Sequence, residues 1–212
     1  MKMCNATRGR LVLAVLVLGL GLVASAAAAA EKEDAWKALW DGKTLDGWHK
    51  IGVGQWTIED GAIVGRKKKE DPNFGHLVTD KVFGDFTARL KFKVLKGNSG
   101  FYFRIEEKGG SGVSGFQAEV EPGLTTGGLY ETNGRAWVVQ PKAEVVKKAF
   151  KPNEWNEMVV SAHGGDITVT LNGVKTAELK DDPGKWREGR LALQLHGGND
   201  MLVMFKDIEV RK

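Results

Sequence analysis

Apolar and polar residues alternate one by one along several short segments of this chain, and this period of two constrains the fold most. Residues 86–94 place Phe, Ala, Leu, Phe and Val at even positions, with Thr, Arg and Lys between them. Successive strand residues face opposite sides of a sheet, so the pattern predicts a strand with one buried and one solvated face. Residues 167–171 alternate similarly and run into Asn172-Gly173, a strong hairpin signal.

Turn signals separate the expected strands throughout the chain. Gln55–Ile58 and Ala62–Val64 flank Glu59-Asp60-Gly61, which predicts a second hairpin. The chain contains 28 Gly and 5 Pro, and strands that recur about every ten residues indicate a β-sandwich or barrel. The only helix we expect is a short turn from Asp34 to Leu39, because no later segment keeps a helical period.

The first thirty residues have the order of a secretory signal peptide. A basic start is followed by Leu, Val, Ala and Gly alone from Leu11 to Val23, and then by Ala24-Ser25-Ala26. This apolar run is too short to span a bilayer comfortably, so no membrane span is expected after cleavage, although an uncleaved anchor is the alternative. We therefore expect a secreted or periplasmic protein with a signal peptide at 1–30 and a single domain at 31–212.

Charge and motifs exclude several functional classes. Three basic residues and no acid lie in residues 1–30, so the formal charge of +4 for the whole chain falls to +1 for residues 31–212. Such a balance predicts no nucleic-acid partner. Phosphate-loop and dinucleotide motifs are absent from the sequence, so no nucleotide cofactor is expected. The only cysteine, Cys4, precedes the domain and leaves it without disulfides.

Three predicted strands carry unusual polar residues on the face opposite their apolar residues. These segments are 101–104, 116–120 and 191–196, and their period of two sorts Phe, Ala, Val and Leu to one face. The other face is predicted to carry Tyr102, Arg104, Gln117, Glu119, Gln194 and His196. Amide, carboxylate, guanidinium and imidazole groups are suited to binding sugar hydroxyls. The alternative is that these groups satisfy one another on an exposed sheet.

Further residues could contribute to a site on this face. Trp137 or Trp155 could stack on a sugar ring, and the imidazole of His196 could titrate near neutral pH. His76 stands beside a glycine and a strand, and the sequence does not decide its role. A divalent cation held by Glu119, Glu121 and main-chain oxygens is an open alternative, and no His- or Cys-based metal spacing exists.

An ordered set of motifs resembles the 3-keto-disaccharide hydrolase domain family, long described only as a domain of unknown function. The motifs cover nearly the whole of residues 31–212. They are Leu39-Trp40-Asp41-Gly42-Lys43-Thr44-Leu45-Asp46-Gly47-Trp48, Trp56-Thr57-Ile58-Glu59-Asp60-Gly61, Leu77-Val78-Thr79, Asn98-Ser99-Gly100-Phe101-Tyr102-Phe103-Arg104, Glu154-Trp155-Asn156, Leu171-Asn172-Gly173, Leu193-Gln194-Leu195-His196-Gly197 and Val203-Met204-Phe205-Lys206-Asp207-Ile208.

The resemblance implies an all-β fold, a two-sheet jelly-roll sandwich of the concanavalin-like lectin and glucanase type. It also implies cleavage of glycosides that are already oxidised at C3. The chain departs from the family at one informative place. Where the family often reads Gly-Tyr-Glu-x-Gln, this chain has Gly115-Phe116-Gln117-Ala118-Glu119, which exchanges the carboxylate and the amide.

We therefore expect an exported carbohydrate-active enzyme that removes the C2 proton of a 3-keto-glycoside and then eliminates and hydrates at C1. The expected base is Glu119 or His196, and Arg104 or a bound cation is expected to stabilise the enediolate. The side chains expected to bind the sugar are Gln117, Gln194, Asn98, Tyr102, Tyr130 and Trp137. The alternative is a non-catalytic, lectin-like carbohydrate-binding module. The sugar, the linkage and the oligomeric state are not predicted.

Overall fold

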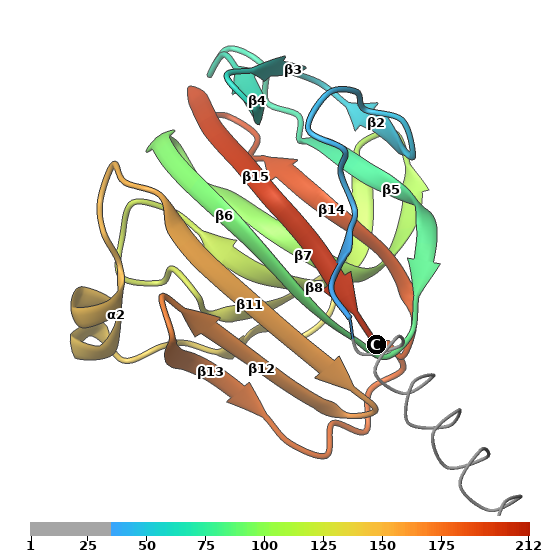
Figure 1. Ribbon diagram of the computed structural model, residues 1–212, viewed down its shortest axis with the longest axis vertical. Coiled ribbons are helices and arrows are strands. Elements are labelled where there is room, and N and C mark those ends of the chain that lie inside the picture. The colour runs from blue at the N-terminus through green and yellow to red at the C-terminus, as the bar shows by residue number, and fades with distance from the viewer. Residues whose placement is uncertain (1–34) are drawn as a thin grey trace, which may run out of the picture. The chain divides into compact units, whose positions relative to one another are not determined.

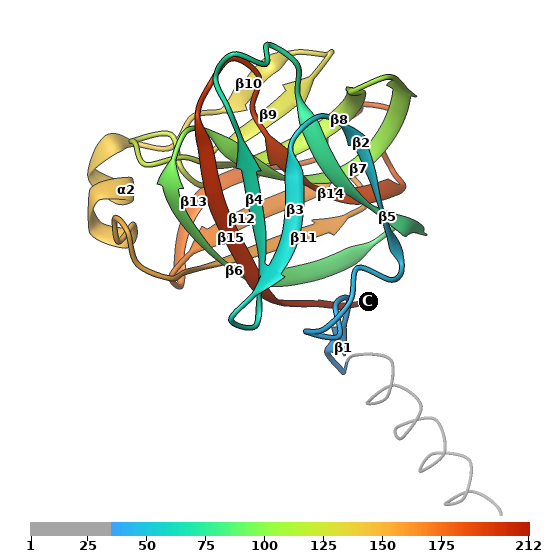
Figure 2. The ribbon, with the colours of Figure 1, turned by 90° about the horizontal axis from the view of Figure 1, so that it is seen from above.

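The computed structural model describes residues 35–212, of which residues 36–212 form one compact unit. Two antiparallel sheets pack face to face, with the first sheet toward the viewer in Figure 1 and both layers visible in Figure 2. This arrangement confirms the predicted all-β, two-sheet sandwich of the concanavalin-like type. The predicted signal peptide at 1–30 lies outside the described residues.

The first sheet contains eight strands, and its order interleaves distant parts of the chain. Seven strands follow one path and β1 pairs with β15 beside that path. In spatial order they are β13 (Val174–Leu179), β12 (Asp166–Leu171), β11 (Asn156–His163), β6 (Phe86–Lys96), β15 (Met201–Arg211), β4 (Ala62–Lys67) and β3 (Gln55–Glu59), with β1 (Lys37–Ala38).

The second sheet contains seven strands and carries the polar residues singled out above. Its three central strands, β8 (Gly112–Val120), β7 (Ser99–Gly109) and β14 (Gly189–Leu195), contain the three segments that the sequence assigns a polar face. In spatial order the strands are β10 (Ala136–Val139), β9 (Leu129–Thr132), β8 (Gly112–Val120), β7 (Ser99–Gly109), β14 (Gly189–Leu195), β5 (Gly75–Phe83) and β2 (Trp48–Gly52).

The alternation of residues builds one core between the two sheets. On β6, each residue at an even position from Phe86 to Val94 is buried, and the residues between them are partly exposed. On the facing sheet, Phe101 and Phe103 of β7 are fully buried in the same core. Each such side chain contributes about 1.5–3 kcal/mol when it is removed from water, so the two inner faces hold the sandwich together.

Both predicted hairpins are present. Asp60 and Gly61 have φ values of 49° and 69° between β3 and β4, and Asn172 and Gly173 have φ values of 48° and 79° between β12 and β13. Two successive positive φ angles give the tight turn whose twist matches paired strands, and Asn, Asp and Gly tolerate that conformation best.

The helix prediction was wrong. Lys37 and Ala38, within the expected helix, instead pair with Val210 and Glu209 of β15. The described residues contain one short helix, α2 (Ala143–Ala149), which lies beside β13. Its seven residues bury only two side chains, too few to create a periodic signal in the sequence. Within residues 35–212, no helix has the length and apolarity needed to cross a bilayer.

Candidate functional site

The outer face of the second sheet carries the polar side chains at the predicted positions. Tyr102 of β7 is the Cα partner of Gln117 on β8, and Gln117 is the partner of Tyr130 on β9. Paired residues in adjacent strands point to the same face of a sheet. Since the intervening phenylalanines lie in the core, this row of polar residues lies on the opposite, outer face.

These residues line one cavity of about 460 Å³, which we call the polar-face pocket. Its size is within the usual range for small-molecule sites. It brings together eight of the nine predicted site residues, and Arg104 is not among them. The lining residues are Phe74, His76, Asn98, Tyr102, Ser111, Gly112, Val113, Gln117, Glu119, Tyr130, Thr132, Asn133, Trp137, Gln194 and His196.

Glu119 is a buried carboxyl group held by two amides in this pocket. Only 4% of the residue is exposed. Gln117 Nε2 donates a hydrogen bond to Glu119 Oε2 over 2.7 Å, and Asn98 Nδ2 donates to Oε1. Burial raises the pKa of Glu119 to about 7, although the bond from Asn98 opposes the shift. A carboxyl group with such a pKa can both take up and release a proton near neutral pH.

Gly100 keeps the floor of the pocket open beside Glu119. Gly100 on β7 is the Cα partner of Glu119 on β8. A Cβ atom at this position would lie 2.7 Å from Gln117 Nε2 and 2.6 Å from its Cγ. The amide of Gln117 therefore reaches the Glu119 carboxylate only because residue 100 has no side chain.

Tyr102 and Gln194 form a second buried polar pair. Gln194 Nε2 donates to Tyr102 Oη over 2.9 Å, and Thr132 Oγ1 donates to the same oxygen over 3.1 Å. Burial raises the pKa of Tyr102 well above its usual range, so the phenol stays protonated at neutral pH. Neither side chain carries charge, so this part of the pocket is suited to neutral hydroxyl groups.

His196 lies at the mouth of the pocket, next to Phe74. Its Nδ1 is 2.7 Å from the carbonyl oxygen of Gly197, and its ring meets the Phe74 ring edge to face at 4.8 Å. The Gly197 carbonyl can only accept, whereas Nδ2 of the Asn199 amide, which lies 3.1 Å from the same Nδ1, can only donate; we assign the proton to Nδ1 on the shorter contact. In neutral His196 the lone pair then lies on Nε2, which can accept a proton from a substrate or a water.

Aromatic side chains close the opposite side of the pocket. Tyr130 of β9 and Trp137 of β10 are Cα partners, and their rings meet edge to face at 5.4 Å. Trp137 thus stands where a sugar ring could stack on it. Trp155 was the other expected platform, but it lies outside the pocket, with Lys206 Nζ of the first sheet 4.3 Å from its ring.

The expected position of Arg104 beside Tyr102 was wrong. Arg104 has φ of +50°, and the register of β7 with β8 shifts between Phe103 and Glu106. This bulge breaks the period of two, so the side chain leaves the outer face. Its guanidinium is fully buried and donates to Gly164 O at 2.8 Å and to the carboxylate of Asp85 at 3.0 Å. It also reaches the carbonyl oxygens of Ala162 and Trp186, and therefore ties together loops at one end of the sandwich.

The residues expected to hold a cation do not gather into a site. Within residues 35–212, no three His, Cys, Asp or Glu side chains cluster in a way that could ligate a metal. The oxygens of Glu119 accept amide hydrogens, and Glu121 Oε1 accepts the backbone N–H of Thr125 at 3.1 Å. We therefore assign no step to a metal.

His76 and Phe74 are pocket residues that the sequence did not assign. His76 is 1% exposed on β5, and burial lowers its pKa to about 4. Its sequence neighbours are Gly75 on one side and apolar Leu77 and Val78 on the other, so alternation alone does not mark its face. Its pairing with Gln194 across β14 and β5 is the signal that places it, and this appears only in the fold.

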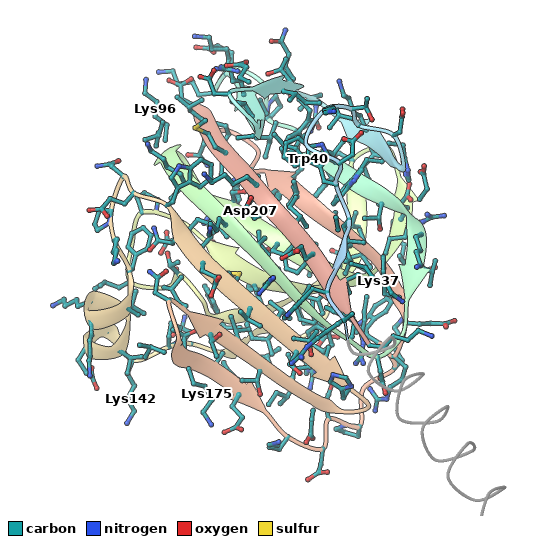
Figure 3. The ribbon with its side chains drawn as sticks, in the orientation of Figure 1. Lys37, Trp40, Lys96, Lys142, Lys175 and Asp207 are labelled. Atoms are coloured by element: carbon teal, nitrogen blue, oxygen red, sulfur yellow. The ribbon has the colours of Figure 1, made fainter. Side chains whose placement is uncertain are left out.

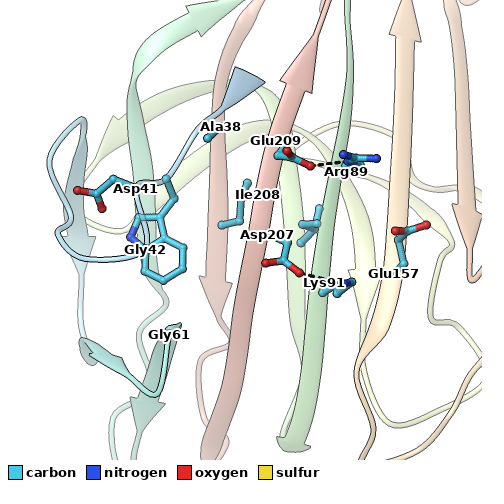
Figure 4. A pocket seen from close by; sticks show the side chains of 12 residues that line it. Ala38, Asp41, Gly42, Gly61, Arg89, Lys91, Glu157, Asp207, Ile208 and Glu209 are labelled. Carbon is cyan, nitrogen blue, oxygen red and sulfur yellow. Dashed lines mark hydrogen bonds and ion pairs between the residues drawn. The ribbon is translucent and has the colours of Figure 1, made fainter. Parts of the chain in front are cut away.

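The outer face of the first sheet has a hollow of similar size, about 500 Å³, with a different character (Figure 4). Figure 3 labels two of its residues, Trp40 and Asp207, on this face. We call this hollow the charged groove. Its lining residues are Ala38, Trp40, Asp41, Gly42, Gly61, Arg89, Leu90, Lys91, Glu157, Asp207, Ile208 and Glu209. Figure 4 shows two ion pairs across it, Arg89–Glu209 at 2.5 Å and Lys91–Asp207 at 2.9 Å.

Comparison with known proteins agrees with the fold and the motifs. A sequence profile of the 3-keto-alpha-glucoside-1,2-lyase-like domain matches residues 35–211. A 3-keto-disaccharide hydrolase of Bacteroides thetaiotaomicron is 35% identical over 83 residues, which are 35% of this chain and 29% of that protein. The match thus spans less than a third of that relative's length.

Solved structures share the same sandwich. A candidate glycosyl hydrolase from Parabacteroides distasonis has a TM-score of 0.63 at 23% identity, covering 86% of this chain and 95% of that one. A carbohydrate-binding module from Bacillus subtilis has a TM-score of 0.61 at 17% identity, covering 78% and 96%. At these identities the likeness establishes the fold alone.

Proposed function

Because the chain belongs to the 3-keto-alpha-glucoside-1,2-lyase-like family, we propose that it cleaves glycosides oxidised at C3, and that it does so in the polar-face pocket. The observation that carries this proposal is Glu119. It is a buried carboxyl group with a pKa raised to about 7, held in place by two amides. Groups with such shifted pKa values are typical of catalytic acids and bases.

The chemistry requires a base near C2 and hydrogen-bond donors near the C3 oxygen. A ketone at C3 acidifies the proton on C2, and its removal gives an enediolate. Collapse of the enediolate re-forms the ketone, creates a C1–C2 double bond and expels the C1 oxygen, which leaves with the proton that the base removed from C2. Water then adds at C1 while C2 regains a proton, so the net reaction is hydrolysis.

We assign the removal of the C2 proton to Glu119. Asn98 and Gln117 each use one amide hydrogen to hold this carboxylate, and each amide nitrogen carries a second hydrogen. These second hydrogens lie next to the base. Because the C3 oxygen lies next to C2, they are suited to donating to this oxygen and so to stabilising the enediolate. They take the role that the sequence suggested for Arg104.

The remaining pocket residues bind and hydrate the sugar in this proposal. Nε2 of His196 accepts the proton of the water that adds at C1. Trp137 stacks on the sugar ring, and Tyr130 lines the same wall. Tyr102 and Gln194 bind hydroxyl groups.

The exchange of Glu and Gln relative to the family motif is compatible with this chemistry. Positions 117 and 119 are two residues apart on β8, so both side chains point to the outer face. Their mutual hydrogen bond of 2.7 Å keeps a carboxylate and an amide side by side. The exchange therefore moves the base by about 7 Å along the strand and retains the pair.

We also propose that the domain acts outside the cytoplasm. Residues 1–30 run from a basic start through an apolar stretch to small residues, which is the order of an export signal. The processed amino terminus of protein recovered from the periplasm or medium would test this: cleavage near residue 30 supports export, and an intact cytoplasmic chain contradicts it.

The activity is tested by incubating the purified protein with a 3-keto-disaccharide, with and without a chelator. We expect consumption of the sugar in both cases and a loss of at least about 100-fold in kcat for Glu119→Gln. Glu157→Gln in the charged groove is the matched control and is expected to keep full activity. Saturable sugar binding without turnover would instead indicate a carbohydrate-binding module, and chelator sensitivity would contradict the metal-free mechanism.

A further inference from the structure

Two buried side chains in the polar-face pocket have hydrogen-bonding atoms that remain unpaired. His76 is 1% exposed, and neither Nδ1 nor Nε2 has a partner among residues 35–212. Gln194 is 2% exposed, and its Oε1 also lacks a partner in this part of the chain. Leaving such an atom buried and unpaired costs about 1–3 kcal/mol, and native proteins rarely tolerate it.

The fold places these two residues next to each other. His76 on β5 and Gln194 on β14 are Cα partners in adjacent antiparallel strands, so their Cβ atoms lie about 5 Å apart on one face. Both line the pocket. The unpaired atoms are therefore neighbours at one end of the cavity.

Neighbouring side chains fix the orientation of both groups. The Nε2 atom of Gln194 donates to Tyr102 Oη, which turns Oε1 to the other side of the amide. The His76 ring meets the Tyr102 ring edge to face at 5.3 Å and stacks on Phe74 at 6.4 Å. An amide and an imidazole that are held in place without partners are prepared for a ligand.

The chemistry of the pair selects the kind of group that it binds. Burial keeps His76 neutral at pH 7, so its ring offers one N–H donor and one lone pair, while Gln194 Oε1 is an acceptor. A hydroxyl group can donate to Oε1 and accept from the imidazole N–H at the same time. An ionised carboxylate has no hydrogen to donate, so it cannot satisfy Gln194 Oε1.

We propose that His76 and Gln194 together recognise one hydroxyl group of the sugar and so determine which keto-sugars the pocket accepts. This inference rests on the proposed function. Glu119 and His76 are separated by three strand spacings, from β8 across β7 and β14 to β5, or about 14 Å between their backbones. The recognised hydroxyl therefore lies away from C2 and C3, and His76 is a specificity residue, not the base.

The test compares a 3-keto-disaccharide with analogues that each lack one hydroxyl group. For the wild type, we expect one analogue to lose at least about 100-fold in kcat/KM, because the pair is left unpaired. His76→Phe keeps the ring shape. We expect its kcat/KM for the parent sugar to fall by a similar factor, and its kcat/KM for that analogue to be no lower than its value for the parent sugar. His49→Phe is the matched control, since His49 lies outside the pocket and pairs with Asp80 at 2.7 Å. If His76→Phe loses the same factor in kcat/KM between the parent sugar and that analogue as the wild type does, the inference is overturned while the proposed function stays intact.

A second readout covers the case in which the wild type turns over no keto-sugar, or in which His76→Phe fails to fold. Ring-nitrogen chemical shifts of ¹⁵N-histidine-labelled wild type are measured while the parent sugar is added. We expect the His76 signals to shift with the parent sugar and to stay in place with one of the analogues that lack a hydroxyl group. Signals that do not move at saturating sugar would overturn the inference and indicate that only water occupies this end of the pocket.

Discussion

The two outer faces of the sandwich have hollows of nearly equal size but opposite electrostatic design. In the charged groove four ionic side chains form two ion pairs, and those of Lys91 and Asp207 are 44% and 53% exposed. In the polar-face pocket five polar side chains are buried, namely His76, Tyr102, Gln117, Glu119 and Gln194, and those of His76 and Gln194 retain unpaired atoms. Exposed pairs are screened by water and contribute little, whereas buried groups acquire shifted pKa values and unmet hydrogen bonds. Volume alone does not separate the two hollows; burial and pairing do.

The largest expected effect is on the free energy of unfolding, when a buried residue that stabilises the fold is replaced and compared with a buried residue of the pocket. Arg104→Met removes a buried cation and leaves several carbonyl oxygens without donors, so the free energy of unfolding should fall by about 3–5 kcal/mol. Glu119→Gln removes a carboxyl that is costly to ionise, and the loss should stay below about 1 kcal/mol. Denaturant titration at pH 7 measures both. Equal losses in the two variants would contradict the assignment of separate roles.

The pH dependence of stability should reveal both buried titratable groups of the pocket, with opposite signs. The pKa of Glu119 is raised from 4.5 to about 7 on folding, so its contribution is full below pH 4.5 and is lost as the pH rises to 7. The pKa of His76 is lowered from 6.5 to about 4, so its contribution is full above pH 6.5 and is lost as the pH falls to 4. Each change amounts to at most about 3 kcal/mol.

Single variants separate these two contributions. Relative to the wild type, Glu119→Gln should become more stable by up to about 3 kcal/mol between pH 4.5 and 7. As the pH rises from 4 to 6.5, the wild type gains the contribution of His76, so His76→Phe should become less stable relative to the wild type by a similar amount. Urea titrations across this pH range measure the free energy of unfolding of each variant relative to the wild type. If neither difference changes with pH, these groups are not buried as described.

A smaller effect tests the open floor of the pocket. Gly100→Ala introduces a Cβ atom 2.7 Å from Gln117 Nε2, which pushes the amide away from Glu119. We expect a loss of about 10-fold in activity, equivalent to about one hydrogen bond, with little change in the melting temperature. Gly84→Ala is the matched control, since nothing lies within 4 Å of a Cβ atom there. Equal activity in the two variants would mean that the bond between Gln117 and Glu119 is dispensable.

The smallest effect is expected in the charged groove. Lys91→Met breaks an exposed ion pair with Asp207, and such pairs contribute about 0–1 kcal/mol. The free energy of unfolding should change by no more than this, and activity should not change. A large loss of activity would show that the groove takes part in function and would remove the distinction between the two faces.

The sequence predicted which side chains line the polar-face pocket where the period of two is regular. On β8 and β14 alternation placed Gln117, Glu119 and Gln194 on the outer face, and the structure gathers them in one pocket. The hairpins were predicted equally well, because a turn of Asp-Gly or Asn-Gly is encoded by two adjacent residues.

The sequence failed where the structure depends on contacts between distant segments. The bulge at Arg104 turns this one side chain of β7 to the other face of the sheet. Gly115 and Gly189 pack against the bulge so closely that a Cβ atom at either glycine would lie 2.7 Å or less from the backbone of Arg104. No local pattern in the sequence records that packing. His76 was missed for a related reason: its burial and its pairing with Gln194 arise from strand order, which periodicity does not determine.

The measurement that tests the central claim most directly is the incorporation of solvent deuterium at C2 of the sugar product. The wild type is incubated with a 3-keto-disaccharide in D₂O, and the product is analysed by NMR against a sample without enzyme. If Glu119 removes the C2 proton and solvent returns it, the product carries deuterium at C2, and Glu119→Gln yields neither product nor exchange above background. Product that retains hydrogen at C2, or full exchange in Glu119→Gln, would contradict this account of the polar-face pocket.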